Sequence, residues 1–219
     1  LKAYLTPQAQ KPDFKTRFDW LVDLTDAVML AHKADMVHHE ISVESVHVDQ
    51  RGKVRLINYL PARMKYLFEQ QSGESSTCSP FAISPEKLKN GFEDVEGDVF
   101  SLGVLAYVLL VGSFPFKGST KDEILYVRLP EGNSAVSKAT EEGKQAPKEI
   151  AYQQPFPPRK LNSIISTAAS EAVMKMLNPK LEERLELEKA KEVFKEAGEY
   201  AAKAEQKAFS FLGRLAILK

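Results

Sequence analysis

The polar residues that could do chemistry gather in one short stretch, "MVHHEISVESVHVDQRGKVRLINYL", residues 36–60. Its histidine and glutamate side chains can take up and release protons, as general acids and bases do. An alternating apolar stretch leads into a turn at residues 49–52, and a β-rich run follows at 54–57. The question is whether this stretch still performs catalysis or keeps only the shape of something that did.

The histidines do not predict a metal centre. A zinc site needs three or four nitrogen or sulfur ligands that converge on one point, and the chain has a single cysteine. His38 and His39 are neighbours, so their side chains point to opposite sides of an extended chain. His32 and His47 complete no set with them. We therefore expect no metal and no other cofactor.

The composition is that of a soluble globular protein, with 43% hydrophobic and 27% charged residues. The 30 basic residues equal the 30 acidic ones, which argues against a nucleic-acid partner. The longest apolar run, 104–111, is too short to span a membrane. The lone Cys78 excludes an intrachain disulfide and favours a reducing compartment, so we expect an intracellular, cytoplasmic protein. Because residue 1 is Leu, we expect a segment of something longer.

Hydrophobic periodicity predicts a mainly helical chain with one small β element. The segment 97–112 is apolar nearly all round, which is typical of a helix buried on every side. The polar segment 130–158 is interrupted by Gly and Pro, which indicates a long surface loop. The remaining expected elements are a short helix or turn before residue 13, an amphipathic helix at 16–34, strands and turns at 36–60, a loop at 61–85, and helices at 120–129, 162–177 and from 186 to near the end.

Four motifs in order give the chain a family resemblance. "VHHEISVESVHV" with "GKVRLINYL" resembles the catalytic loop and metal-binding motif of protein kinases. "SPEKL" resembles the Ala-Pro-Glu motif that ends the activation segment, and "GDVFSLGVLAYVLLVGSFPF" resembles the buried kinase helix. "MLNPKLEERLELEKA" resembles a later kinase segment. Glu86 and Asp98 also have the family spacing of 12 residues.

The resemblance implies the fold of the C-terminal (large) lobe of a protein kinase, over residues 1–194. The segment 130–158 would be a surface insertion in this lobe, and 195–219 a C-terminal helical extension. The motifs of the small lobe, namely a Gly-rich loop, a Val-Ala-Ile-Lys strand and a helix-borne Glu, have no counterpart in the 219 residues.

The residues at the family's catalytic positions differ from those that phosphoryl transfer needs. Glu40 stands at the base position, where its extra methylene displaces the carboxylate. Ser45 and Asn58 stand at the metal-ligand positions, and both are neutral where hard cations prefer carboxylate charge. Leu60 replaces a hinge glycine. With His39, Ser42 and Tyr59 also altered, we expect no catalytic residue, and hence a pseudokinase that is not an enzyme.

The residues that match the family are structural. The resemblance implies that Asp98 bonds to the backbone of the catalytic loop and that His38 packs beneath the metal motif. It also implies that Glu86 and Arg184 form the ion pair that ties the activation segment to the late helices. A lobe that keeps these four anchors should fold.

The leading interpretation is an interaction, scaffolding or regulatory module. Its partner would be a protein, for example an active kinase or a multi-protein assembly. One candidate surface is the peptide-docking face that the resemblance implies, formed by residues 81–88 and 114–127, and the other is an apolar stripe on the C-terminal helix. That stripe either folds back on its own lobe, fits the groove of a partner, or forms the seam of a homo-oligomer; Gly198 and Gly213 argue against one long rigid coil. The partner-binding candidates are Phe114, Phe116, Tyr126, Tyr200, Phe211 and Leu215.

Two alternatives remain open at this point. The KIND domain is also a kinase large lobe without a small lobe, and it binds basic peptides. The other alternative is a fragment of a longer, divergent kinase-like protein that has residual nucleotide binding and uses Glu40.

Overall fold

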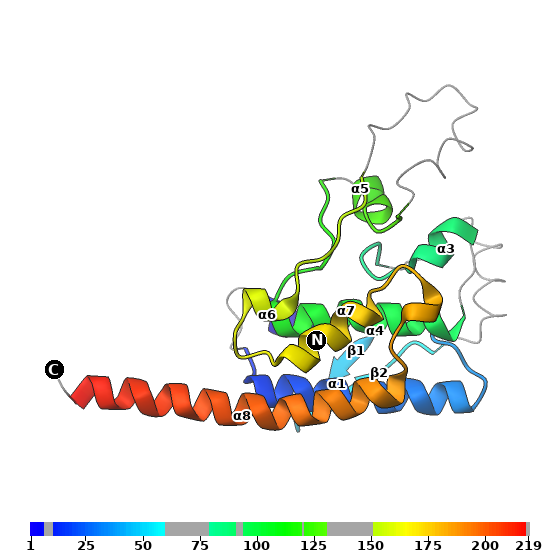
Figure 1. Ribbon diagram of the computed structural model, residues 1–219. Helices are drawn as coiled ribbons and strands as arrows, with labels where there is room; N and C mark the ends of the chain where they lie inside the picture. Colours follow the sequence, from blue (N-terminus) through cyan, green and yellow to red (C-terminus); the bar gives the residue numbers. More distant parts are fainter. Residues whose placement is uncertain (7–10, 60–78, 91–93, 120, 131–150, 218–219) are drawn as a thin grey trace.

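The computed structural model describes the backbone of residues 1–6, 11–59, 79–90, 94–119, 121–130 and 151–217 (Figure 1). In this part of the chain helices predominate and two short strands form a hairpin, as expected for a kinase large lobe. The side chains of the last helix are described up to residue 207. The elements are η1 (Lys2–Leu5), α1 (Phe14–Lys33), β1 (Val46–Val48), β2 (Val54–Leu56), α3 (Pro85–Asn90), α4 (Val95–Val111), α5 (Lys121–Tyr126), α6 (Pro158–Leu161), α7 (Thr167–Met176), η3 (Leu181–Glu183) and α8 (Leu187–Ile217).

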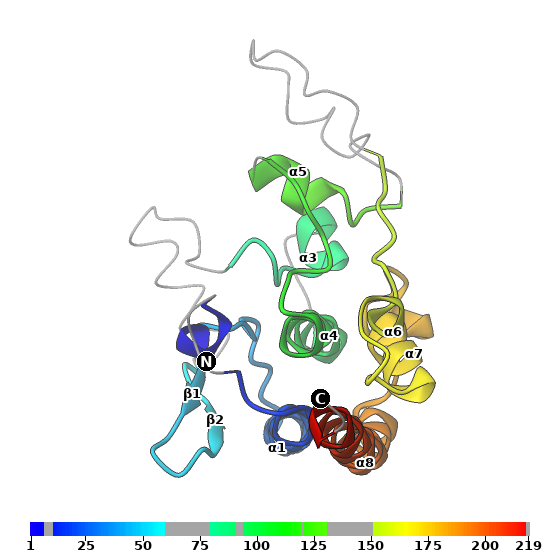
Figure 2. The ribbon, with the colours of Figure 1, turned by 90° about the vertical axis from the view of Figure 1, so that its left-hand side faces the viewer.

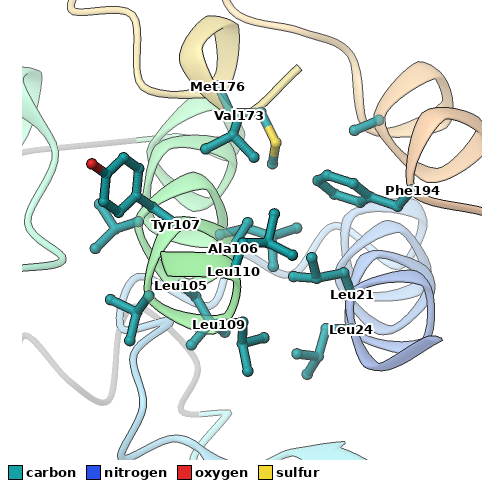
Figure 3. Close-up of a cluster of buried hydrophobic side chains, with 14 of the residues drawn as sticks. Leu21, Leu24, Leu105, Ala106, Tyr107, Leu109, Leu110, Val173, Met176 and Phe194 are labelled. Carbon is teal, nitrogen blue, oxygen red and sulfur yellow. The ribbon is translucent and has the colours of Figure 1, made fainter. Parts of the chain in front are cut away.

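Helix α4 is the centre of the fold, as its uniformly apolar sequence predicts. The Asp94 side chain accepts a bond from the Val95 amide at its start, and Gly112 ends it in the left-handed conformation, at φ 84°. Every residue from 97 to 110 is buried. Figure 3 shows leucines of α4 directed toward Leu21 and Leu24 of α1, with Phe194 of α8 and Met176 of α7 closing the cluster.

Helices α1 and α8 lie side by side and antiparallel, forming one layer below α4 (Figures 1 and 2). The Phe14 amide at the start of α1 donates to Glu205, near the far end of α8. At Lys191, near the start of α8, the ammonium pairs with Asp26 at 2.6 Å. The described part of the C-terminal helix therefore folds back on its own lobe, while α8 continues past the start of α1 (Figure 1).

Glycine does not interrupt the C-terminal helix. Helix α8 runs continuously over 31 residues and includes both Gly198 and Gly213. A Cβ added at Gly198 would lie 3.2 Å from the Phe18 Cβ of α1. This glycine therefore permits the close approach of two helices, and that packing outweighs its low helix propensity. The proposed domain boundary at 194/195 falls within α8.

The hairpin of β1 and β2 packs against α1. Its strands are antiparallel, with Val46 opposite Leu56. The indole of Trp20 on α1 donates to the Gly52 carbonyl at 2.8 Å and so ties the hairpin turn to the helix. This arrangement places the end of β2 next to the loop that follows α1.

The remaining short helices differ from the expected boundaries. Helix α5 ends at Tyr126 and α7 begins only at Thr167, where the Ser166 side chain caps it. Residues 158–161, at the edge of the expected loop, form α6, which Pro158 begins. Residues 131–150 of that loop, and 61–78 of the earlier one with Cys78, lie outside the described residues.

Candidate functional site

Asp98 of α4 organises the loop that follows α1. Its side chain is fully buried, and its carboxylate accepts bonds from the His38 and His39 amides, each at 2.8 Å. The imidazole Nε2 of His32, at the end of α1, lies 2.8 Å from the same carboxylate. A buried carboxylate is costly unless it has such partners. Asp98 of α4 thus holds the end of α1 and the loop that follows it, which lie 59–66 residues earlier in the sequence.

His38 fixes the other side of the loop. It is buried, and its Nδ1 accepts a bond from the Glu40 amide at 3.2 Å. Because Nδ1 is an acceptor there, Nε2 carries the proton and donates it to the Ile57 carbonyl at 2.9 Å. His38 is thus a neutral imidazole that connects the loop to the residue after β2.

The backbone beside these bonds is in an unusual conformation. His39 has φ 64° and Asn58 has φ 70°. Such values cost on the order of 1–3 kcal/mol each and persist where the surroundings enforce them; the cost is lower for Asn, which tolerates this region. The His39 amide is held by Asp98, and its carbonyl accepts a bond from the Lys87 ammonium at 3.3 Å. Glu40, which is half-buried, therefore follows a turn whose backbone is held by hydrogen bonds on both sides of His39.

The residues at the family's metal-ligand positions do not fit a divalent cation. The hydroxyl of buried Ser45 closes a turn with Ser42: it accepts from the Ser42 amide at 2.9 Å and donates to the Ser42 carbonyl at 3.1 Å. Asn58 contributes a neutral side chain, whereas Mg²⁺ and Ca²⁺ favour carboxylates. In the described part of the chain, no cluster of three His, Cys, Asp or Glu residues could hold a metal ion.

Tyr59 packs beneath this loop rather than facing solvent. Its ring lies edge-on to the His38 ring, with 4.5 Å between centroids, and its hydroxyl donates to the Ala27 carbonyl at 3.3 Å. Burial, and to a lesser extent the nearby charge of Asp98, raises the pKa of Tyr59 to about 12. Leu60, the next position, lies outside the described residues.

Glu86 and Arg184 form a two-pronged ion pair. Two guanidinium nitrogens reach the two carboxylate oxygens at 2.7 Å each, and only 2% of the Arg184 side chain and 10% of the Glu86 side chain are exposed. Arg184 also donates to the Glu96 carbonyl at 2.6 Å and lies over the Phe100 ring. The pair links α3, the start of α4 and the segment before α8.

A second buried arginine, Arg128, was not identified from the sequence. Its side chain is 1% exposed, and its guanidinium donates to the carbonyls of Pro80, Phe81, Ile83 and Ile124. It also lies over the Phe116 ring at 5.0 Å. Arg128 thereby holds residues 80–83, which precede α3, against α5. Nothing in the sequence marks it, because its partners are backbone carbonyls. The role of His32 was also missed. Its place on the apolar face of α1 was the one signal that it is buried.

The aromatic residues after α4 have different environments. Phe116 is 2% exposed and stacks on Phe100 in the core, so it is not available to a partner. Phe114 is half-buried and stacks on Phe81, with ring centroids 3.9 Å apart and planes 15° from parallel. The Phe81–Phe114 pair therefore lies at the surface of the segment that Arg128 holds.

The other partner-binding candidates do not gather at one place. Tyr126 packs partly against the core, whereas Tyr200 on α8 is 46% exposed. Phe211 and Leu215 lie on the helical end of α8, and their side chains are outside the described residues. Among the described helices, none is both long and apolar enough to cross a membrane.

Comparison with known proteins agrees with this geometry. The family model of the protein kinase domain matches residues 1–195. CBL-interacting protein kinase 1 of Oryza sativa subsp. japonica is 32% identical over 117 residues, which are 52% of this chain and 25% of the relative. Serine/threonine-protein kinase PknL of Mycobacterium tuberculosis is 33% identical over 99 residues, 45% of this chain and 25% of the relative. The matches thus span about a quarter of the length of these curated relatives.

These relatives correct one expectation. The substitutions in the catalytic loop led us to expect that the chain is not an enzyme. That expectation is wrong, because the relatives are named as protein kinases and the matching family model is that of the kinase domain, which together point to an enzyme. The match covers the catalytic loop, the ion pair and the buried helix described above. This chain therefore belongs to the protein kinase domain family, whose model matches a region that includes both the loop anchored by Asp98 and the Glu86–Arg184 pair.

Proposed function

We propose that this chain binds a protein partner, as a regulatory or scaffolding lobe of a kinase-family protein. The partner would lie on the face that residues 79–83 and 114–119 form beside α3 and α5. One observation carries the proposal, namely the stacked Phe81–Phe114 pair on a segment that buried Arg128 holds in place. Helices α3 and α5 stand together above the helical layers, which leaves this face at the edge of the molecule (Figure 2).

The physical reason is preorganisation. An interface gains most of its affinity from a few rigid aromatic anchors, because these bury a large area at a small cost in side-chain entropy. Phe81 is on the segment before α3 and Phe114 follows α4, so each ring limits the motion of the other. An extended peptide with apolar side chains fits such a pair. The relative named "CBL-interacting" supports the idea of a protein partner, which here would be an active kinase or a component of a larger assembly.

Site-specific photocrosslinking tests this function. A photoreactive phenylalanine analogue at position 114 should capture a specific protein in the source cell, and Phe81→Ser in the same chain should abolish the capture. The matched control carries the analogue at Phe156, which is 64% exposed and outside the pair. Equal capture from both positions, or capture that Phe81→Ser leaves unchanged, would contradict the proposal.

The fixed loop favours a second function, phosphoryl transfer by a longer protein that contains this lobe. Three hydrogen bonds, from the His38, His39 and Glu40 amides, hold the backbone that carries Glu40. A carboxylate at this position can accept the proton of a hydroxyl group, which contributes roughly 10²- to 10⁴-fold to a rate when it is well placed.

A single substitution separates the two functions. In the longer protein, Glu40→Gln should lower phosphoryl transfer at least about 100-fold if Glu40 is the base, while partner capture at position 114 remains. The matched control is Glu44→Gln, an exposed glutamate on the same loop. An unchanged rate in the Glu40 variant would refute the role of Glu40 and leave the binding proposal intact.

A further inference from the structure

A groove of about 510 Å³ opens where α1 ends and where α4 and α8 begin. Its apolar lining comes from Met29 of α1, Val95 and Val99 of α4, Leu187 of α8, and Leu181 and Leu185 of the segment before α8. Val99 and Leu187 also belong to the buried hydrophobic core. The groove therefore reaches the core while remaining open to solvent.

The rim of this groove is acidic. Four glutamates line it, Glu96, Glu182, Glu186 and Glu188. The basic residues in its wall are Lys33, His32 and Arg184, but the last two already bond to Asp98 and Glu86. Glu186 has its own partner in Lys189 at 2.9 Å. An apolar floor with a surplus of carboxylates suits a basic, apolar segment.

The end of this chain has that chemistry. Residues 206–219, "QKAFSFLGRLAILK", contain three basic residues, no acidic residue and eight of Ala, Phe, Leu and Ile. Helix α8 carries this segment past the start of α1, which it leaves near Glu205 (Figure 1). The groove lies at the first turn of the same helix. A straight helix of about 20 residues separates the groove from residue 206, a distance of roughly 30 Å at 1.5 Å per residue, so the segment cannot reach the groove of its own copy.

We infer that two copies of the chain form a dimer in which residues 206–219 of each copy occupy the groove of the other. Because the groove is at the beginning of α8 and the segment is at its end, one antiparallel arrangement satisfies both contacts and closes with two-fold symmetry. The occupant would contact the wall that contains His32 and Arg184. Those side chains hold Asp98 and Glu86, so dimer formation would also stabilise the loop and α3.

Charge exchange between the two surfaces tests the inference. One variant carries Glu182→Lys and Glu188→Lys in the groove, and the other carries Arg214→Glu and Lys219→Glu in the segment. Each variant alone places like charges together, which should raise the dimer dissociation constant at least about tenfold in analytical ultracentrifugation. An equimolar mixture should regain the wild-type dissociation constant, because both contacts in the mixed dimer are complementary again.

The mixture also distinguishes a lost interface from a lost fold, because a misfolded chain cannot restore pairing. The matched control is Glu192→Lys with Glu196→Lys, two exposed glutamates of α8 outside the groove, which should leave the dimer unchanged. A wild-type chain that stays monomeric at its solubility limit would overturn the inference. So would a dimer that neither variant weakens, or a mixture that remains dissociated.

Discussion

Replacing Glu86 by Gln should be among the most destabilising single substitutions in this lobe. The change keeps the size of the side chain but removes its charge, which leaves the guanidinium of Arg184 buried without a carboxylate. Arg184 is 2% exposed, so water cannot replace the two 2.7 Å bonds. Breaking a buried pair on one side costs about 3–5 kcal/mol. The remaining bonds of Arg184 to the carbonyls of Glu96 and Asn178 keep the guanidinium buried, so it cannot move out to solvent.

Urea denaturation measures this cost directly. The chain has a single tryptophan, Trp20, which is 4% exposed, so its fluorescence reports unfolding of the lobe. With an m-value of about 2 kcal/mol per M, a loss of about 4 kcal/mol lowers the midpoint by about 2 M urea. Circular dichroism at 222 nm should give the same midpoint if the transition is two-state.

A double-mutant cycle with Arg184→Met separates the pair from its surroundings. The double variant should be more stable than the sum of the single losses predicts, with a coupling of about 2–3 kcal/mol, because it leaves no unpaired buried charge. If Glu86→Gln costs less than about 1 kcal/mol, the value typical of an exposed pair, the Glu86–Arg184 pair does not stabilise the lobe as a buried ion pair.

Three further predictions concern the loop and the core. Asp98→Asn should cost about 3 kcal/mol, since the amide NH₂ faces a backbone donor, and should speed amide exchange at His38 and His39 as measured by mass spectrometry; equal exchange rates would refute the anchoring role. Tyr59 stays protonated in the folded protein while the unfolded chain ionises at its ordinary pKa of 10, so stability falls as pH rises from 10 to about 12. Absorbance at 295 nm should lose the transition near 12 in Tyr59→Phe, and a variant that retains it would contradict the assignment. Gly103→Ala should cost about 1–3 kcal/mol in urea denaturation, because the new Cβ would lie 2.8 Å from the Met176 Cβ of α7; a gain in stability would show that α4 and α7 separate readily.

Much of the fold could be read from local patterns. The all-round apolar sequence of 97–112 predicts a buried helix, and α4 is buried from 97 to 110 because no polar face exists to meet solvent. The 3.6-residue period of α1 and the turn at residues 49–52 predict their elements for equally local reasons. Boundaries were less accurate where caps decide them. Helix α7 begins at Thr167 rather than at residue 162, because the Ser166 side chain caps it by accepting a bond from the Ala169 amide.

Glycine shows where local reasoning fails. Propensity alone marks Gly198 as a weak point of a helix, yet α8 is continuous there because Phe18 of another helix lies close to the missing side chain. The roles of Arg128 and His32 were hidden for the same reason. Three of the four carbonyls that Arg128 bonds lie 45–48 residues away, and the carboxylate beside His32 lies 66 residues away.

Residue types and their order along the chain were enough to establish that the chain is helical, that it carries the ordered kinase motifs, and that neutral side chains stand at the family's metal-ligand positions. These properties depend on residue type and on spacing along the chain. Tertiary structure alone decided which groups meet: that Asp98 holds the loop of Glu40, that Phe116 is buried while Phe114 stacks at the surface on Phe81, and that an acidic groove opens beside His32 and Arg184. These outcomes require residues far apart in the sequence to converge. Side-chain packing sets that convergence, and no local pattern encodes it.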